Sequence, residues 1–179
     1  MKKSVKVTIC AVIYVLAIAA LSALFILLGP SQSTAPAEDE FPAYTATRIE
    51  NSLYSDLSGW AYEAQNGETR YTAPDGTAYF VVKRAAAYQK DLAEYVRANL
   101  RSITAERTEF LSELSVGEIA GRETYAFTYA DFGIAPAQYR KVYFFNTDGC
   151  TYGAMGAAES PEALEQIDFD AIVADYDFE

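Results

Sequence analysis

The sequence predicts an α+β domain, an antiparallel β-sheet flanked by helices, preceded by one N-terminal transmembrane helix. Three observations support this prediction. Residues 7–28 form an uncharged apolar run, short β-prone segments are separated by Gly-containing turns, and residues 91–103 show helical periodicity. The part of the chain after the apolar run has the length of one ordinary globular domain.

The apolar run is long enough to cross a membrane. A helix rises about 1.5 Å per residue, so residues 7–28 would span the roughly 30 Å hydrocarbon core of a bilayer. Lys2, Lys3 and Lys6 precede the run, and the first charges after it are acidic, at residues 38–40. The positive-inside rule therefore predicts a single-pass protein of the cell membrane, with a basic cytoplasmic N-terminus at residues 1–6.

A cleaved signal peptide is the alternative interpretation of this N-terminus. Ala35-Pro36-Ala37 superficially resembles a small-residue cleavage site. It lies well beyond the apolar run, however, and it contains a proline; the run is also longer than the apolar core of a typical signal peptide. An uncleaved anchor is therefore the preferred interpretation.

Beyond the anchor, composition divides the chain into a linker and a domain. Residues 29–47 are rich in Pro, Ser, Thr and Ala, which predicts a flexible linker, and residues 48–179 are expected to form the extracytoplasmic globular domain. The whole chain has a net charge of −11, of which residues 1–30 contribute +3, so the remainder carries −11 − 3 = −14. This charge disfavours binding to nucleic acid.

The predicted elements follow from periodicity and turn signals. Asn66-Gly67 predicts a tight hairpin turn, and Asp91 with Glu94 is typical of a capping box before an amphipathic helix. Short turns between the later strands predict a meander. In chain order we expect strands at 57–64, 69–72 and 78–82, a helix at 91–103, strands at 110–119, 122–129, 139–145 and 151–155, and a helix beginning after Ser160-Pro161.

The order of these elements resembles the PsbP-like superfamily. The segments that carry the resemblance are Gly59-Trp60-Ala61-Tyr62, the strand and turn at 118–125, the aromatic hairpin from Tyr139 to Asp148-Gly149, and the ending Tyr176-Asp177-Phe178, where the family usually has Ser-Phe. The resemblance covers about residues 50–178. It implies an α/β/α sandwich, no conserved catalytic set, and a binding or assembly role on larger partners.

The absence of histidine limits the chemistry of the chain. Without histidine, Ser-His-Asp and Cys-His catalysis are excluded, and the commonest transition-metal ligand is missing. Only Cys150 lies outside the predicted anchor, and we expect it to be a buried core thiol. The sequence therefore predicts a protein that is not an enzyme and that carries no cofactor.

The acidic C-terminal region raises the alternative of a small-ligand or calcium-binding domain. Residues 159–179 contain eight acidic and no basic side chains. Asp168-Phe169-Asp170 lacks the oxygen ligand and glycine of an EF-hand loop, since Ile172 and Val173 occupy the fifth and sixth positions. A solvated helical face is the expected structure for these acids.

A loop between two predicted strands is the candidate contact surface. Residues 130–137 are mostly apolar and contain Gly and Pro, so Phe132 and Ile134 are expected to meet a partner there. Tyr139, at the start of the next strand, is the third candidate, because tyrosine is enriched at interfaces. The alternative is that the loop's apolar side chains pack under the sheet edge. The favoured function is a membrane-anchored binding or assembly module that contacts another envelope protein.

Overall fold

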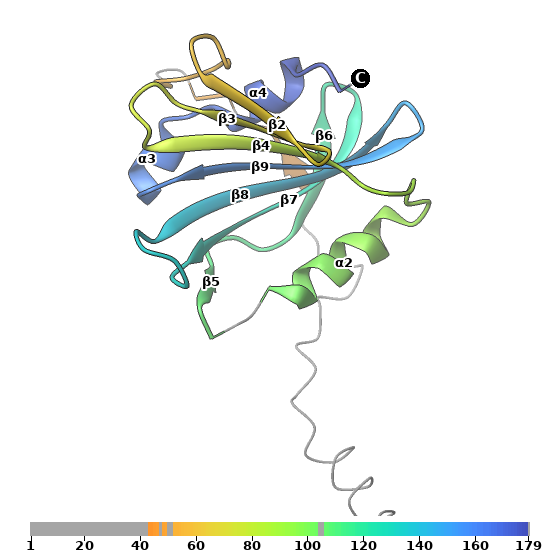
Figure 1. The fold of residues 1–179 in the computed structure, drawn as a ribbon. Helices are drawn as coiled ribbons and strands as arrows, with labels where there is room; N and C mark the ends of the chain where they lie inside the picture. The colour runs from red at the N-terminus through yellow and green to blue at the C-terminus, as the bar shows by residue number, and fades with distance from the viewer. Residues whose placement is uncertain (1–42, 47, 50–51, 104–105, 179) are drawn as a thin grey trace, which may run out of the picture. The chain divides into compact units, whose positions relative to one another are not determined.

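The described residues form one β-sheet with three helices (Figure 1). The computed structural model describes residues 43–46, 48–49, 52–103 and 106–178, all within the second of two compact units, Ala35–Glu179, while the first unit, Met1–Thr34, lies outside them. The strands are β1 (Ala43–Thr45), β2 (Ala61–Gln65), β3 (Glu68–Thr72), β4 (Ala78–Arg84), β5 (Thr108–Phe110), β6 (Ser115–Ile119), β7 (Arg122–Asp131), β8 (Gln138–Thr147) and β9 (Cys150–Ala158).

The sheet is mostly antiparallel, as predicted. Its order is β1-β6-β7-β8-β9-β4-β3-β2, with β5 also paired to β7, and the single parallel pair among the described strands joins β1 to β6. The predicted meander exists as β6 to β9. Strand β4 pairs with β9. The antiparallel strands β2, β3 and β4 therefore extend the sheet beyond β9.

Tight turns of the predicted kind join three pairs of strands. In the Asn66-Gly67, Ala120-Gly121 and Asp148-Gly149 turns, both residues have positive φ, between 49° and 76°. Two consecutive left-handed residues give the turn twist that matches paired strands, and glycine adopts this conformation without a steric cost. These turns fix the registers of β2–β3, β6–β7 and β8–β9.

One predicted strand is divided in two. The range 110–119 was expected to form a single strand, but β5 ends at Phe110 and β6 begins at Ser115. The backbone N–H groups of Leu111 and Ser112 both donate to the carbonyl oxygen of Thr128, at 2.8 and 3.2 Å. Two residues therefore face one on β7, and the edge strand bends there.

The long helix agrees with the sequence prediction. Helix α2 (Leu92–Ser102) is capped by Asp91, whose Oδ1 accepts a hydrogen bond from the Glu94 backbone N–H at 2.9 Å. Its apolar positions Leu92 and Val96 are buried against the sheet. The cap satisfies one of the donors left open at the helix start.

The C-terminal region contains two short helices, and the first begins after Ser160 as predicted. Helix α3 (Pro161–Glu165) begins after Ser160, whose hydroxyl accepts from the Ala163 N–H at 3.1 Å. Helix α4 (Phe169–Asp175) begins after Asp168, whose Oδ1 accepts from the Ala171 N–H at 2.9 Å. Phe169, Ile172 and Val173 of α4 are buried in the core.

Helices cover both faces of the sheet. Along β8, Val142 and Phe144 belong to the cluster that contains α2, whereas Tyr143 and Phe145 belong to the cluster that contains α3 and α4. Neighbouring residues of a strand point to opposite faces, so the two clusters lie on opposite sides of the sheet. The side chains of β7 divide between the two clusters in the same way, with Ala126 on the α4 side and Tyr125 and Phe127 on the α2 side.

The C-terminal tail packs against the sheet and is hydrogen-bonded to it. Phe178 is buried, and its carbonyl oxygen accepts a hydrogen bond from the Tyr152 hydroxyl at 2.8 Å. The Arg122 guanidinium donates to the carbonyl oxygens of Val173 and Ala174 at the end of α4, and lies 4.9 Å from the Phe178 ring centroid. The described C-terminal tail, up to Phe178, is therefore part of the core.

The predicted anchor and most of the predicted linker lie outside the described residues. Within the described part of the chain, no helix has both the length and the apolar character needed to cross a membrane. Residues Ala43–Thr45, at the end of the range predicted to be a flexible linker, form β1 and pair with β6. The sheet thus begins before residue 48, the predicted start of the domain.

Candidate functional site

The loop between β7 and β8 exposes both of its predicted contact residues. Phe132 has 52% and Ile134 46% of its surface exposed. The Phe132 N–H donates to the Arg107 carbonyl oxygen at 2.7 Å, and the Gly133 N–H donates to Asp131 Oδ1 at 2.9 Å. These bonds hold the backbone at Phe132 and Gly133, and the side chains of Phe132 and Ile134 face water beside them.

Space at Gly133 is limited, which explains the glycine in this loop. A Cβ atom there would lie 3.0 Å from Asp131 Oδ1 and 3.1 Å from Arg107 Cδ. A larger residue would press against the Asp131 carboxylate, which accepts the Gly133 N–H, and against the Arg107 side chain. The predicted alternative, in which the apolar side chains pack under the sheet edge, does not describe Phe132 or Ile134.

Tyr139 differs from the other two predicted contact residues. It pairs with Ala130 and Ala158 and is partly buried against the core on the α4 side of the sheet. The structure therefore brings Phe132 and Ile134 together on one loop, but gives the Tyr139 ring a packing role. Two further exposed apolar residues, which the sequence reasoning missed, lie at the end of β5: Phe110 and Leu111, 47% and 46% exposed.

A cavity of about 210 Å³ lies beside α4. Its lining includes four carboxylates, one guanidinium and several small or aliphatic side chains. We call it the acidic cavity; its charged residues are Arg48, Glu118, Asp168, Asp170 and Asp175.

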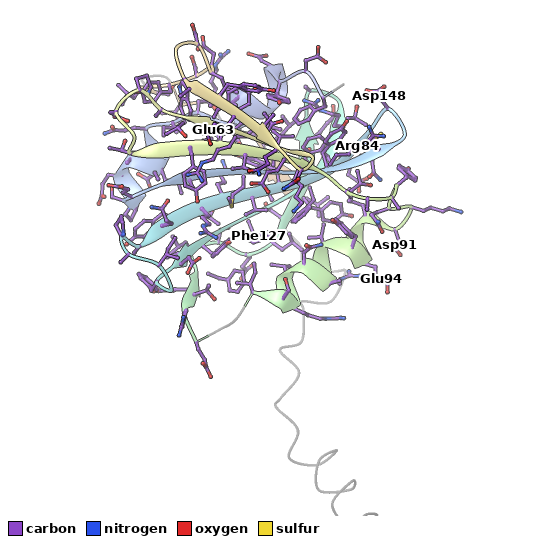
Figure 2. All side chains as sticks on the ribbon, viewed as in Figure 1. Glu63, Arg84, Asp91, Glu94, Phe127 and Asp148 are labelled. Carbon is purple, nitrogen blue, oxygen red and sulfur yellow. The ribbon has the colours of Figure 1, made fainter. Side chains whose placement is uncertain are left out.

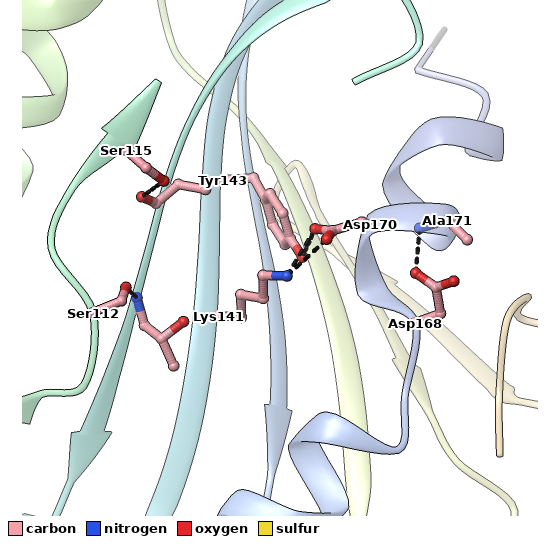
Figure 3. Close-up of polar contacts among 9 residues, drawn as sticks. Ser112, Ser115, Lys141, Tyr143, Asp168, Asp170 and Ala171 are labelled. Carbon is pink, nitrogen blue, oxygen red and sulfur yellow. Dashed lines mark hydrogen bonds and ion pairs between the residues drawn. The ribbon is translucent and has the colours of Figure 1, made fainter. Parts of the chain in front are cut away.

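Asp168 is the most deeply buried acid of this cavity. Its side chain is 1% exposed, and Oδ1 caps α4 through the Ala171 N–H (Figure 3). Oδ2 is buried and has no hydrogen-bond donor. The nearest described cation is the Arg48 guanidinium, whose Nε lies 3.6 Å from Oδ2 on a side chain that is 71% exposed.

Asp170 is paired more completely. Lys141 Nζ lies 2.9 Å from both carboxylate oxygens, and the Tyr143 hydroxyl donates to Oδ1 at 2.8 Å (Figure 3). The three side chains come from α4 and β8. This cluster therefore joins the helix to the sheet, with charge-assisted hydrogen bonds from both donors to one carboxylate.

The burial of these two acids corrects a sequence prediction. Asp168 and Asp170 were expected on a solvated helical face, but both are buried. One serves as a helix cap, and the other meets Lys141, which precedes it by 29 residues. The cap had a local signal, since a short apolar pattern follows Asp168, whereas the pairing with Lys141 depends on tertiary structure. Among the described residues, no group of three or more acidic or cysteine side chains is arranged to hold a metal ion.

A larger cavity of about 680 Å³ lies at the start of α2, where Figure 2 labels Asp91 and Glu94. Its lining includes Tyr125, and burial, together with a hydrogen bond to Glu123, raises the pKa of Tyr125 to about 12. Asn146, also in the lining, donates to the Gln89 carbonyl oxygen and accepts from the Thr151 hydroxyl. The amide is thus occupied in holding the chain before α2.

Cys150, expected to be a buried core thiol, is a free cysteine in the structure. It is partly buried at the start of β9 and packs against the core on the α4 side.

Comparisons with known proteins give structural neighbours only. No family model and no curated protein matches the chain. One solved structure, of the Pseudomonas aeruginosa protein PA94, a proposed regulator of unknown function, is 16% identical with a TM-score of 0.46 over 58% of this chain and 75% of its own. Another, from Bacteroides thetaiotaomicron VPI-5482, is 13% identical with a TM-score of 0.46 over 65% of this chain and 41% of its own. Both are uncharacterised, neither description names the PsbP-like superfamily, and neither assigns an activity to this chain.

Proposed function

We propose that this protein is a membrane-anchored binding or assembly module whose extracytoplasmic domain contacts another envelope protein through the β7–β8 loop. The observation that carries the proposal is the exposure of Phe132 and Ile134 on a loop whose Phe132 and Gly133 N–H groups are hydrogen-bonded to the Arg107 carbonyl oxygen and the Asp131 carboxylate. Exposed apolar groups on a fixed backbone favour binding, because less conformational entropy is lost on association. The placement in the cell membrane rests on residues 7–28 and the preceding lysines.

The proposed module is non-catalytic and PsbP-like. Helices on both faces of an antiparallel sheet fit the α/β/α sandwich of that superfamily, and the buried Phe178 fits its closing aromatic residue. The lack of histidine in the whole chain agrees with a role in binding. Nucleic acid is not a proposed partner, because the chain is strongly acidic.

In-cell cross-linking of the full-length protein tests the proposal. We expect wild type to capture one partner and the Phe132→Ala/Ile134→Ala variant to lose most of it, since large apolar anchors at an interface typically contribute about 2 kcal/mol each. Recovery is measured by quantitative mass spectrometry of the cross-linked complexes.

The matched control is the Leu53→Ala/Tyr88→Ala variant, which removes two large side chains that are at least as exposed, at 62% and 53%, from other parts of the surface. The control should keep the partner. Equal loss in both double variants, or equal recovery in both, would exclude the β7–β8 loop as the contact surface.

A small-ligand or calcium-binding domain is the second candidate, and the acidic cavity is the observation that favours it. A ligand that binds only the folded state raises the melting temperature. Calcium titration followed by differential scanning calorimetry of the full-length protein distinguishes the candidates, because a calcium-dependent rise is expected for the second one alone.

A further inference from the structure

The buried oxygen Asp168 Oδ2 lacks a donor that burial would normally require. Buried carboxylate oxygens are usually hydrogen-bonded or paired with a cation, because leaving water is costly for a charged group. Asp168 is 1% exposed, its Oδ1 is already used by α4, and Oδ2 accepts no hydrogen bond. Oδ2 thus provides an acceptor for a cationic donor on the wall of the acidic cavity.

The walls of the cavity suit a cation that carries an alkyl chain. Ile119 and alanines 46, 120, 171 and 174 supply aliphatic surface, while Glu118 and Asp175 add negative charge at exposed positions. Lysine and arginine side chains combine a methylene stem with a charged end in this way. A guanidinium also offers several N–H donors to a carboxylate.

Arg48 is a cation of this chain that contacts Asp168 only weakly. Its Nε approaches Asp168 Oδ2 to 3.6 Å, beyond hydrogen-bond distance, and most of its side chain is in water. An exposed arginine held at this distance contributes little stability. A better-fitting guanidinium or ammonium could displace it.

We propose that the acidic cavity binds the guanidinium or alkylammonium group of a basic ligand, with Asp168 Oδ2 as the main acceptor and Arg48 as an internal competitor. The inference names the ligand class for the second candidate function, so it rests on the cavity and does not depend on Phe132 and Ile134. It also distinguishes two possible ligands of that second candidate function, an organic cation and calcium.

The test uses the full-length protein in detergent micelles and the peptide acetyl-Gly-Arg-Gly-amide. Backbone amide shifts of the cavity residues are followed by NMR, and the peptide in which citrulline replaces arginine is the uncharged probe. We expect shifts at the cavity with the arginine peptide, weaker shifts at high salt, and none with citrulline.

Two variants of cavity residues and one control variant outside the cavity test the assignment. Arg48→Ala removes the competitor at an exposed position, and we expect about threefold tighter binding. Asp168→Asn keeps an N-cap residue but removes the charge, and we expect at least about tenfold weaker binding. Glu165→Gln, an exposed acid outside the cavity lining, should leave affinity unchanged.

The source of the cation is distinguished by a third probe, butylguanidinium. Comparable binding of this free cation points to a small molecule, whereas a clear preference for the peptide points to a protein side chain. Unchanged affinity in Arg48→Ala, or equal response to citrulline, overturns the inference. A calcium response at the same amides without an arginine response would also overturn it, while leaving the second candidate function in place.

Discussion

At the scale of single residues, Asp170 brings a negative charge between α4 and the sheet, and its neighbours compensate that charge. Lys141 and Tyr143 both reach it, and the lysine side chain is 27% exposed against 8% for the aspartate. Loss of the partner is therefore more costly for Asp170 than for Lys141. An unpaired Lys141 can be hydrated, whereas an unpaired Asp170 remains largely out of water.

We expect Lys141→Met to destabilise the domain by about 3 kcal/mol, because it leaves a buried carboxylate without its cation. Asp170→Asn should cost less, and the double variant Lys141→Met/Asp170→Leu should regain part of the loss. Urea denaturation of all three variants gives these free energies of unfolding. Equal costs for the two single variants, with no recovery in the double variant, would contradict this account.

The sequence was informative about single residues wherever the signal was local. Asp91 and Ser160 were recognised as helix caps because a cap and the N–H group that it binds are only three residues apart. The pairing of Asp170 with Lys141 has no such spacing, so burial of this acid could not be foreseen. The exposure of Phe132 likewise depended on whether its loop turned toward or away from the sheet.

At the scale of elements, α4 lies against β9 where the strand has no side chain. The Phe169 ring occupies the place that a Cβ atom of Gly156 would take. Phe169 also stacks on Phe80, with ring centroids 6.3 Å apart. The close approach of helix and strand thus requires glycine at this position for reasons of space.

Gly156→Ala should therefore destabilise the domain by at least about 2 kcal/mol, because the added methyl group forces Phe169 from its position. Phe169→Leu in the same chain should recover part of the loss by making room. The stabilities of the two single variants and the double variant are measured by thermal unfolding. Gly153→Ala is the milder comparison, since its Cβ would meet the Phe144 ring at 3.3 Å.

Elements with a strong period or a tight turn were predicted well, and irregular ones were not. Helix α2 and the hairpins at Asn66-Gly67 and Asp148-Gly149 follow directly from local signals. The break between β5 and β6 was missed, since it is produced by shared hydrogen bonds to Thr128. Strand β1 was missed because three residues in a Pro- and Ala-rich stretch carry no period.

At the scale of the whole molecule, two buried tyrosines and one partly buried tyrosine link stability to alkaline pH. Burial is the main cause that raises the pKa of Tyr125 to about 12, and it also raises the pKa values of Tyr152 and Tyr176. A tyrosine whose pKa is higher in the folded state holds its proton more tightly there. Its contribution to stability is complete below the ordinary value of 10.0 and is lost as pH rises through the folded-state value.

We therefore expect the urea midpoint to stay level from about pH 8 to about pH 9.5 and to fall steeply above about pH 10. Tyr125→Phe should reduce the steepness, because one of the three groups no longer ionises on unfolding. Tyr88→Phe, at a position 53% exposed, is the control and should leave the slope unchanged. A slope in Tyr125→Phe equal to that of wild type would assign the pH dependence to other groups.

The order of the sheet was only partly foreseeable. The meander from β6 to β9 is joined by short connections, so neighbours in sequence are neighbours in space. The pairs β4–β9 and β1–β6 join segments far apart in the chain, and hydrophobic pattern alone does not choose among such partners. The α+β class could therefore be predicted, while the placement of its first strands could not.

The placement of β1 has a mechanical consequence. Strands β1 and β2 follow each other in the chain but lie at opposite ends of the strand order, and Tyr54, between them, is tied to Asp168 by a backbone hydrogen bond. A pull applied from the N-terminal side reaches the three-residue pairing of β1 first and the Tyr54 tie next. The domain would then lengthen in small steps under tension, while the meander from β6 to β9 stays paired.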